Sequence, residues 1–144
     1  MRVFVDTSII LAFLVGQDDR ALEIIRRIER REITGYINPL VIDETIYGYL
    51  RLATGHSARR IRKLLARRDE RLIRMIKDEV QPILKLFTTL PLAAEPGEVA
   101  GLIEEHGLMP ADALIALTCK QHEISVIATL DEDFKQIPWL KVIP

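Results

Sequence analysis

The sequence has little cysteine and no long apolar run. Its one cysteine, Cys119, has no partner for an internal disulfide, which favours a reducing compartment such as the cytoplasm. Cys119 lies among apolar residues, so we expect it to be a small buried side chain. The apolar stretch Ile9–Val15 is far shorter than the ~20 residues that cross a membrane. No signal peptide is visible at the start. We therefore predict a cytoplasmic protein without a membrane segment.

The composition gives no indication of disorder. Hydrophobic residues make up 49% of the 144 residues and charged residues 28%, which is typical of folded proteins. A chain of this length can bury a core without disulfides or a structural metal. It shows no internal repeat, low-complexity segment or linker. We therefore predict a single domain over residues 1–144.

The net charge of −1 conceals an uneven distribution of charge along the chain. Residues 51–77 contain ten basic and two acidic residues, a net charge of +8, whereas the remainder has ten basic and nineteen acidic residues, a net charge of −9. A basic segment attached to an acidic body is typical of an enzyme that acts on a polyanion. An ordinary solvated helix face gives the same pattern, so both interpretations remain open.

Short apolar segments rich in β-branched and aromatic residues alternate with segments of helical periodicity. The strand-like segments are residues 2–5, 34–37, 87–90, 125–128 and 141–143. Asn38-Pro39 and Pro110 mark the starts of helices between them. The alternation predicts an α/β fold, a three-layer α/β/α sandwich with a central, mainly parallel sheet. A long helical arm over about residues 56–87 interrupts it, and Pro82 is expected to break or kink this arm.

Four acidic residues occupy positions that a parallel sheet brings to one edge. Asp6 follows the first strand, Asp131 follows the fourth, and Glu44 and Asp112 lie within the first two turns of helices. Ligands bind at this edge, beyond the carboxyl ends of the strands. Clustered carboxylates repel one another, and a bound divalent cation relieves the repulsion. Oxygen ligands suit Mg²⁺ or Mn²⁺, and such an ion can activate water for phosphodiester hydrolysis.

Each acid also has a purely structural explanation. Asp6 can cap the helix that follows, and Asp112 can interact with a helix dipole. Asp131 can form an Asx turn with Asp133, and Glu44 can face solvent. Spacing alone leaves these explanations open.

Four segments carry a resemblance to a known family along nearly the whole chain. They are Val3–Ser8, Asn38–Glu44, Pro110–Ala116 and Thr129–Phe134. In this order and context they resemble the PIN-domain family, specifically toxin ribonucleases of the VapC type. The resemblance implies that the catalytic, metal-binding acids are Asp6, Glu44, Asp112 and Asp131, with Asp133 as a further metal ligand.

The resemblance also assigns the residues around these acids. It places the helix acid directly before Thr45, which favours Glu44 over Asp43, and adjacent helix residues point about 100° apart. Supporting hydroxyl groups that orient carboxylates or a metal-bound water would come from Thr7, Ser8 and Thr129.

The function that the resemblance implies is metal-dependent hydrolysis of RNA by an endoribonuclease that uses Mg²⁺ or Mn²⁺. It further implies a toxin of a toxin–antitoxin pair, with a cognate antitoxin as partner, and a homodimer. The chain departs from compact members in its long, arginine-rich arm. The arm is interpreted either as a surface that follows RNA phosphates or as a hairpin for dimerisation or antitoxin docking. The arginines in question are Arg59, Arg60, Arg67 and Arg71.

Two other classes of function compete with this hypothesis. A non-catalytic RNA-binding or RNA-processing PIN module would keep the fold without turnover. A phosphoacceptor signalling domain also gathers acids at strand ends, but it needs a lysine near them. The nearest candidate is Lys135, which lacks the expected strand context.

Overall fold

The structure, a computed structural model, describes residues 1–144 and contains one five-stranded sheet in the order β3-β2-β1-β4-β5. The strands are β1 (Arg2–Val5), β2 (Thr34–Ile37), β3 (Thr88–Thr89), β4 (Val126–Ala128) and β5 (Lys141–Ile143). Each neighbouring pair is parallel. The predicted α/β fold is confirmed.

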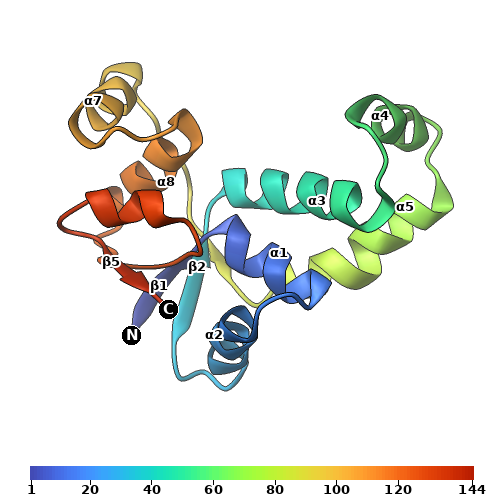
Figure 1. The fold of residues 1–144 in the computed structure, drawn as a ribbon, viewed down its shortest axis with the longest axis horizontal. Helices are drawn as coiled ribbons and strands as arrows, with labels where there is room; N and C mark the ends of the chain where they lie inside the picture. The colour runs from blue at the N-terminus through green and yellow to red at the C-terminus, as the bar shows by residue number, and fades with distance from the viewer.

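Helices cover both faces of this sheet (Figure 1). They are α1 (Thr7–Val15), α2 (Asp19–Glu29), α3 (Pro39–Thr54), α7 (Pro96–His106) and α8 (Pro110–Gln121). The first three lie on one side of the sheet, and α7 and α8 lie on the other. The side chain of Asn38 accepts a hydrogen bond from the amide of Val41, and Pro39 occupies the first turn, which explains why α3 begins there.

The arm differs from the single long helix that the sequence predicts. It contains α4 (Ala58–Ala66), α5 (Glu70–Arg74), the π-helix η1 (Met75–Val80) and α6 (Gln81–Leu84). The break lies at Arg68, whose φ of 53° is left-handed, and the Asp69 side chain then caps α5. Pro82 lies in the first turn of α6 and does not end the helical run. The backbone instead widens into η1 just before Pro82, which lacks an amide hydrogen.

Two separate apolar clusters hold the molecule together. The larger one surrounds the sheet and includes Cys119, which is fully buried as expected. Burial raises the pKa of its thiol to about 12. The smaller cluster joins the arm to α3 and consists of Tyr49, Leu50, Ile61, Leu64, Leu72, Met75 and Val80. Burying a side chain of this kind stabilises a fold by about 1.5–3 kcal/mol, so the arm is anchored by apolar contacts of its own.

The arm gives the molecule a two-pronged outline. It projects beside the end of α3, while α7 and α8 form the opposite prong, and α3 spans the space between them (Figure 1). No helix combines the length and the apolar character that crossing a membrane requires.

Candidate active site

Three carboxylates from the end of the chain lie close together. Asp112 comes from the first turn of α8, while Asp131 and Asp133 come from the start of the 3-10 helix η2 (Glu132–Gln136). One carboxylate oxygen of each lies within 4.8 Å of the corresponding oxygens of the other two. This spacing allows all three residues to bind a single cation.

Asp6 lies at the carboxyl end of β1 and is only 7% exposed. Its Oδ2 accepts hydrogen bonds from Ser8 Oγ and from Thr129 Oγ1, both at 2.7 Å. Its side chain makes no hydrogen bond to the amides of α1, so it does not act as the helix cap. The amide of Asp6 donates to Ala128 O, which places Asp6 beside the end of β4. Because both hydroxyl groups bond to the same oxygen, Oδ1 has no protein donor and is available to a ligand.

Glu44 and Asp43 are neighbours on α3 but have different surroundings. Glu44 is half-buried, and its Oε2 accepts a hydrogen bond of 2.9 Å from Thr7 Oγ1. Asp43 is exposed. Burial raises the pKa of Glu44, and the charges of Asp6 and Asp43 add to this effect while the Thr7 hydroxyl opposes it. Glu44 is therefore the α3 acid that lies toward Asp6.

Asp112 is the acid of this group whose pKa is strongly raised by its surroundings. Burial raises its pKa to about 6, and the charges of other acids add to the effect. In decreasing order of contribution, these acids are Asp131, Asp6, Asp133 and Glu44. None of the five forms an ion pair with a lysine or arginine. Their oxygen atoms and uncompensated charge fit Mg²⁺ or Mn²⁺ better than softer metals.

Hydroxyl groups connect the loop after β4 to the end of β1. Thr129 Oγ1 accepts from the amide of Asp131 at 3.0 Å, and Ser8 Oγ accepts from the amide of Leu130 at 3.0 Å. Asp131 Oδ1 accepts from the amide of Asp133, so the Asx turn that the sequence suggested does form. It occupies one oxygen of Asp131 and leaves the other without a protein donor.

The lysine that a phosphoacceptor domain needs is absent from the acidic cluster. Lys135 Nζ forms an ion pair of 2.6 Å with Glu132 on its own helix. This arrangement does not support the phosphoacceptor hypothesis.

One polar contact near the site escaped the sequence analysis. Asn38 Nδ2 donates a 2.9 Å hydrogen bond to Thr118 Oγ1, and both side chains are fully buried. The bond joins the start of α3, which carries Glu44, to α8, which carries Asp112. The available signal was a threonine within the otherwise apolar run from Ile115 to Cys119.

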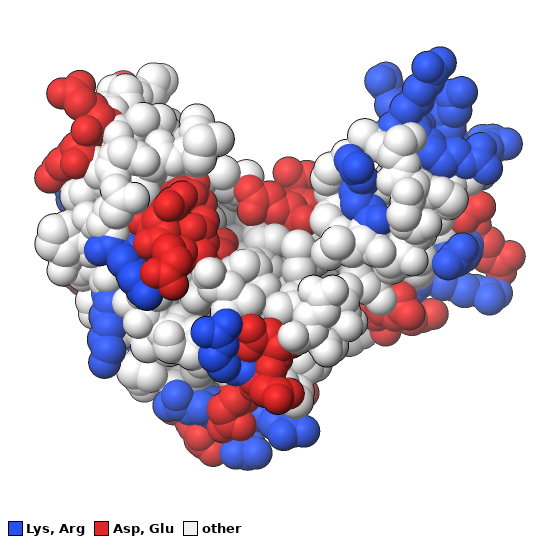
Figure 2. Space-filling view, in the orientation of Figure 1, with Lys and Arg blue, Asp and Glu red and all other residues white.

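The arginines of the arm are not part of the acidic cluster. Arg59, Arg60, Arg67 and Arg71 are all exposed. Figure 2 shows a hollow between the two prongs, with basic side chains gathered over the arm and acidic side chains on the other side and at the floor. The charge asymmetry of the sequence is therefore also a separation in space.

The family model for the PIN domain matches residues 3–140. The chain belongs to the PIN-domain family. It is 34% identical over 143 residues to ribonuclease VapC2 of Methanocaldococcus jannaschii, covering 99% of this chain and 93% of that protein. This agrees with the VapC-type resemblance of the four sequence segments.

Solved structures share the fold of this PIN-domain chain. VapBC2 from Rickettsia felis, bound to a DNA fragment from its promoter, superposes with a TM-score of 0.67 at 18% identity, over 99% of this chain and 98% of that one. A toxin–antitoxin complex from Klebsiella pneumoniae gives a TM-score of 0.61 at 19% identity, over 99% and 96% of the two chains. At these identities the likeness shows the fold alone.

Proposed function

We propose that this PIN-domain protein is a metal-dependent endoribonuclease that hydrolyses phosphodiester bonds in RNA. The observation that carries the proposal is the gathering of Asp6, Glu44, Asp112 and Asp131 from four separate elements without a compensating cation. Burial raises the pKa of Asp112 and of Glu44, and the charges of neighbouring acids add to the effect at both residues. The 34% identical relative that is named a ribonuclease gives the same activity independent support.

Each acid has a distinct part in this proposal. Asp112, Asp131 and Asp133 would hold Mg²⁺ or Mn²⁺, with Oδ1 of Asp6 as a further ligand. The bound ion would activate water and neutralise charge on the leaving oxygen. Glu44, which Thr7 holds on the side of α3 toward Asp6, would help to position the substrate or the attacking water.

The surrounding hydroxyl groups position these acids. Thr7 orients Glu44 through its 2.9 Å hydrogen bond. Ser8 and Thr129 fix Asp6 through Oδ2 and leave Oδ1 without a hydrogen-bond donor from the protein.

We infer that the protein is the toxin of a toxin–antitoxin pair, acts in the cytoplasm and forms a homodimer. An acidic site of this kind suits an antitoxin that inserts a basic side chain among the carboxylates. The shared fold with a toxin–antitoxin complex is compatible with such a partner.

A cleavage assay with two matched substitutions tests the activity. Wild-type protein should cleave RNA with Mg²⁺ or Mn²⁺ and stop when EDTA is added. Asp6→Asn should lower kcat about 1,000-fold, because a preorganised charge at the site is lost. Asp43→Asn, an equal change at the exposed neighbour of Glu44, should stay within about threefold of wild type.

Two results would count against the proposal. Asp6→Asn protein that cleaves RNA as fast as wild type would place the activity elsewhere or in a contaminant. RNA binding without cleavage and without calorimetric binding of Mn²⁺ would favour the non-catalytic RNA-binding module instead.

A further inference from the structure

The arm carries a dense set of cations that no acid neutralises. The exposed basic side chains of α4 and the turn after it are Arg59, Arg60, Arg62, Lys63, Arg67 and Arg68. None of them forms an ion pair, because the only pair in this region joins Arg74 to Glu70. The α4 helix itself contains no acidic residue. The arm therefore presents an unscreened positive surface to solvent.

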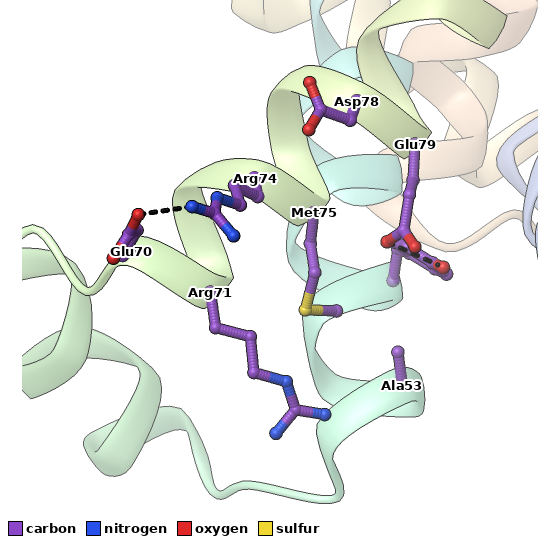
Figure 3. A pocket seen from close by; sticks show the side chains of 8 residues that line it. Ala53, Glu70, Arg71, Arg74, Met75, Asp78 and Glu79 are labelled. Carbon is purple, nitrogen blue, oxygen red and sulfur yellow. Dashed lines mark hydrogen bonds and ion pairs between the residues drawn. The ribbon is translucent and has the colours of Figure 1, made fainter.

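Figure 3 shows the acids nearest the arm, of which Glu70 and Glu79 have partners and Asp78 has none. In a pocket of about 480 Å³ between α3, α5 and η1, Glu70 pairs with Arg74. Tyr49 donates a hydrogen bond of 3.2 Å to Glu79. The side chain of Arg71 extends toward the end of α3 without an acidic partner. Arg71 thus joins the free cations of α4, whereas Arg74 does not.

The surface of the arm has the character of a polyanion-binding face rather than a protein interface. The apolar residues Ile61 and Leu64 of α4 point into the small cluster that anchors the arm. The exposed large apolar side chains of the molecule all lie outside residues 58–74; they are Met1, Tyr47, Leu52, Met109 and Trp139. Cores of protein interfaces are depleted in charge and rich in apolar and aromatic groups, which this surface lacks.

The position of the arm relates it to the acidic site. The helix α3 carries Glu44 in its second turn and ends at Thr54, just before the arm. Ten residues separate these two positions, which is about 15 Å along a helix. Figure 2 shows the basic and acidic groups on opposite sides of one hollow. A nucleic-acid strand rises about 3.4 Å per nucleotide when stacked, so about four to five nucleotides cover the distance.

Given the proposed ribonuclease activity, on which this step rests, we propose that the α4–α5 arm is a second subsite that binds the RNA backbone. It holds a segment of substrate at least about four nucleotides from the phosphodiester that lies among the acids. A metal ion among the acids would offset their repulsion only for the phosphate beside it, so the arm supplies attraction for the rest of the strand. The arginines bind phosphates rather than read bases, so the arm contributes affinity without sequence preference.

A binding experiment with two matched triple variants tests this subsite. The arm variant is Arg59→Ala/Arg60→Ala/Arg67→Ala, and the control is Arg26→Ala/Arg30→Ala/Arg31→Gly at α2 and the two residues after it. Both remove three positive charges from exposed positions. Alanine maintains helices well, and glycine suits the left-handed backbone of Arg31. Fluorescence anisotropy measures binding of a labelled RNA of about 20 nucleotides in the Asp112→Asn background, where the RNA stays intact.

We expect the arm variant to weaken binding at least tenfold at low salt. Between about 50 and 200 mM salt, the slope of log affinity against log salt should fall by about two, because each lost contact to single-stranded RNA removes about 0.7. The α2 variant should stay near wild type in both measurements. In the active background, the arm variant should also lose the advantage of long RNA over a trinucleotide in kcat/KM.

A second pair of variants separates binding from folding. Arg68 and Arg31 both have a left-handed backbone, with φ of 53° and 61°, which glycine adopts without strain. Arg68→Gly and Arg31→Gly should therefore not lower the melting temperature. Only Arg68→Gly should weaken RNA binding, so a general loss of structure cannot explain the effect.

Several outcomes would overturn the subsite. Equal losses of RNA affinity in the arm and α2 variants would mean that RNA binding depends only on the net charge of the protein. Unchanged RNA binding in the arm variant, together with a change of oligomeric mass by light scattering, would make the arm a protein interface. If wild type cleaves RNA with metal but the arm variant behaves like the control, the subsite is wrong and the activity stands. If no cleavage occurs but the arm-specific binding is seen, the activity is wrong and the subsite stands.

Discussion

The acidic site and the basic arm concentrate opposite charges, and the two regions are built in opposite ways. At the site, Asp6 is buried and receives two hydrogen bonds, and Glu44 is held by Thr7. On the arm, Arg59 and Arg67 are exposed and have no ion pairs. A metal centre needs fixed ligands, whereas attraction of a flexible polyanion does not. We therefore expect single substitutions at the site to abolish most of the activity. Single substitutions on the arm should each lower RNA affinity by a small amount.

The largest effect is expected for Asp112→Asn, which should act oppositely on activity and stability. Activity should fall about 1,000-fold, because the cluster loses a ligand and a charge. The metal-free protein should become more stable by about 1–2 kcal/mol at about pH 8, because a partly buried charge and its repulsion with the other acids are both removed. Urea denaturation in EDTA measures the second quantity.

The raised pKa of Asp112 predicts how the stability of the metal-free protein depends on pH. Its ordinary value is 3.8 and its value in the folded protein is about 6, so the folded state binds its proton more tightly than the unfolded state. The contribution of Asp112 to the stability of the metal-free wild type should therefore be most favourable below this window and decline as the pH rises from about 4 to about 6. Asp112→Asn should flatten this decline. If the stability of Asp112→Asn depended on pH as strongly as that of wild type, Asp112 would not be the cause of this decline.

A substitution in the small apolar cluster tests whether the two regions are separable. Leu72 is 1% exposed and packs in the cluster that anchors the arm. Leu72→Ala should cost about 2–4 kcal/mol, since a cavity remains where the side chain packed. Hydrogen exchange should rise most at α4 and α5, and RNA affinity should fall while Mn²⁺ affinity is kept. Equal losses of RNA and Mn²⁺ affinity would contradict the separation.

The hydroxyl group of Thr7 offers a smaller change at the site. Thr7→Val removes the hydrogen bond to Glu44 and should lower activity about 10- to 100-fold, as substitutions behind ligands commonly do. The effect should appear mainly in kcat, because the RNA-binding surface is unchanged. A Thr7→Ser variant should recover most of the activity by restoring the donor.

The smallest effect is expected for Thr45→Val, which makes the same chemical change one residue from Glu44. Thr45 is fully buried and its Oγ1 has no hydrogen-bond partner. Replacing this hydroxyl with a methyl group should stabilise the protein by about 1 kcal/mol, because an unsatisfied polar group is costly. Thermal unfolding checks the gain. A loss of stability would mean that a buried water satisfies Thr45.

The sequence predicted the sheet well because its strands are marked by local patterns. Strand-like segments such as Arg2–Val5 are short and apolar, and Asn38-Pro39 is a clear helix start. The candidate acids were chosen because each follows a strand or lies within the first two turns of a helix. The assignment of Glu44 over Asp43 needed only the angle between adjacent helix positions and the family resemblance.

The features that the sequence missed depend on contacts between distant residues. The break at Arg68 comes from a left-handed residue that is not glycine, so the helical pattern runs through it without a signal. The bond between Asn38 and Thr118 joins residues 80 positions apart. The helical spacing of Ile61, Leu64 and Leu72 does indicate an apolar face on the arm, but it does not indicate that this face packs against α3 as a separate cluster.

The most direct test of the central claim is a crystal structure with Mn²⁺, located by anomalous scattering. We expect a peak bounded by Asp112 and Asp131, with oxygen ligands at about 2.0–2.2 Å, and its loss in the Asp112→Asn variant. A crystal in which Mn²⁺ binds only elsewhere, with these carboxylates pointing into solvent, would contradict the account.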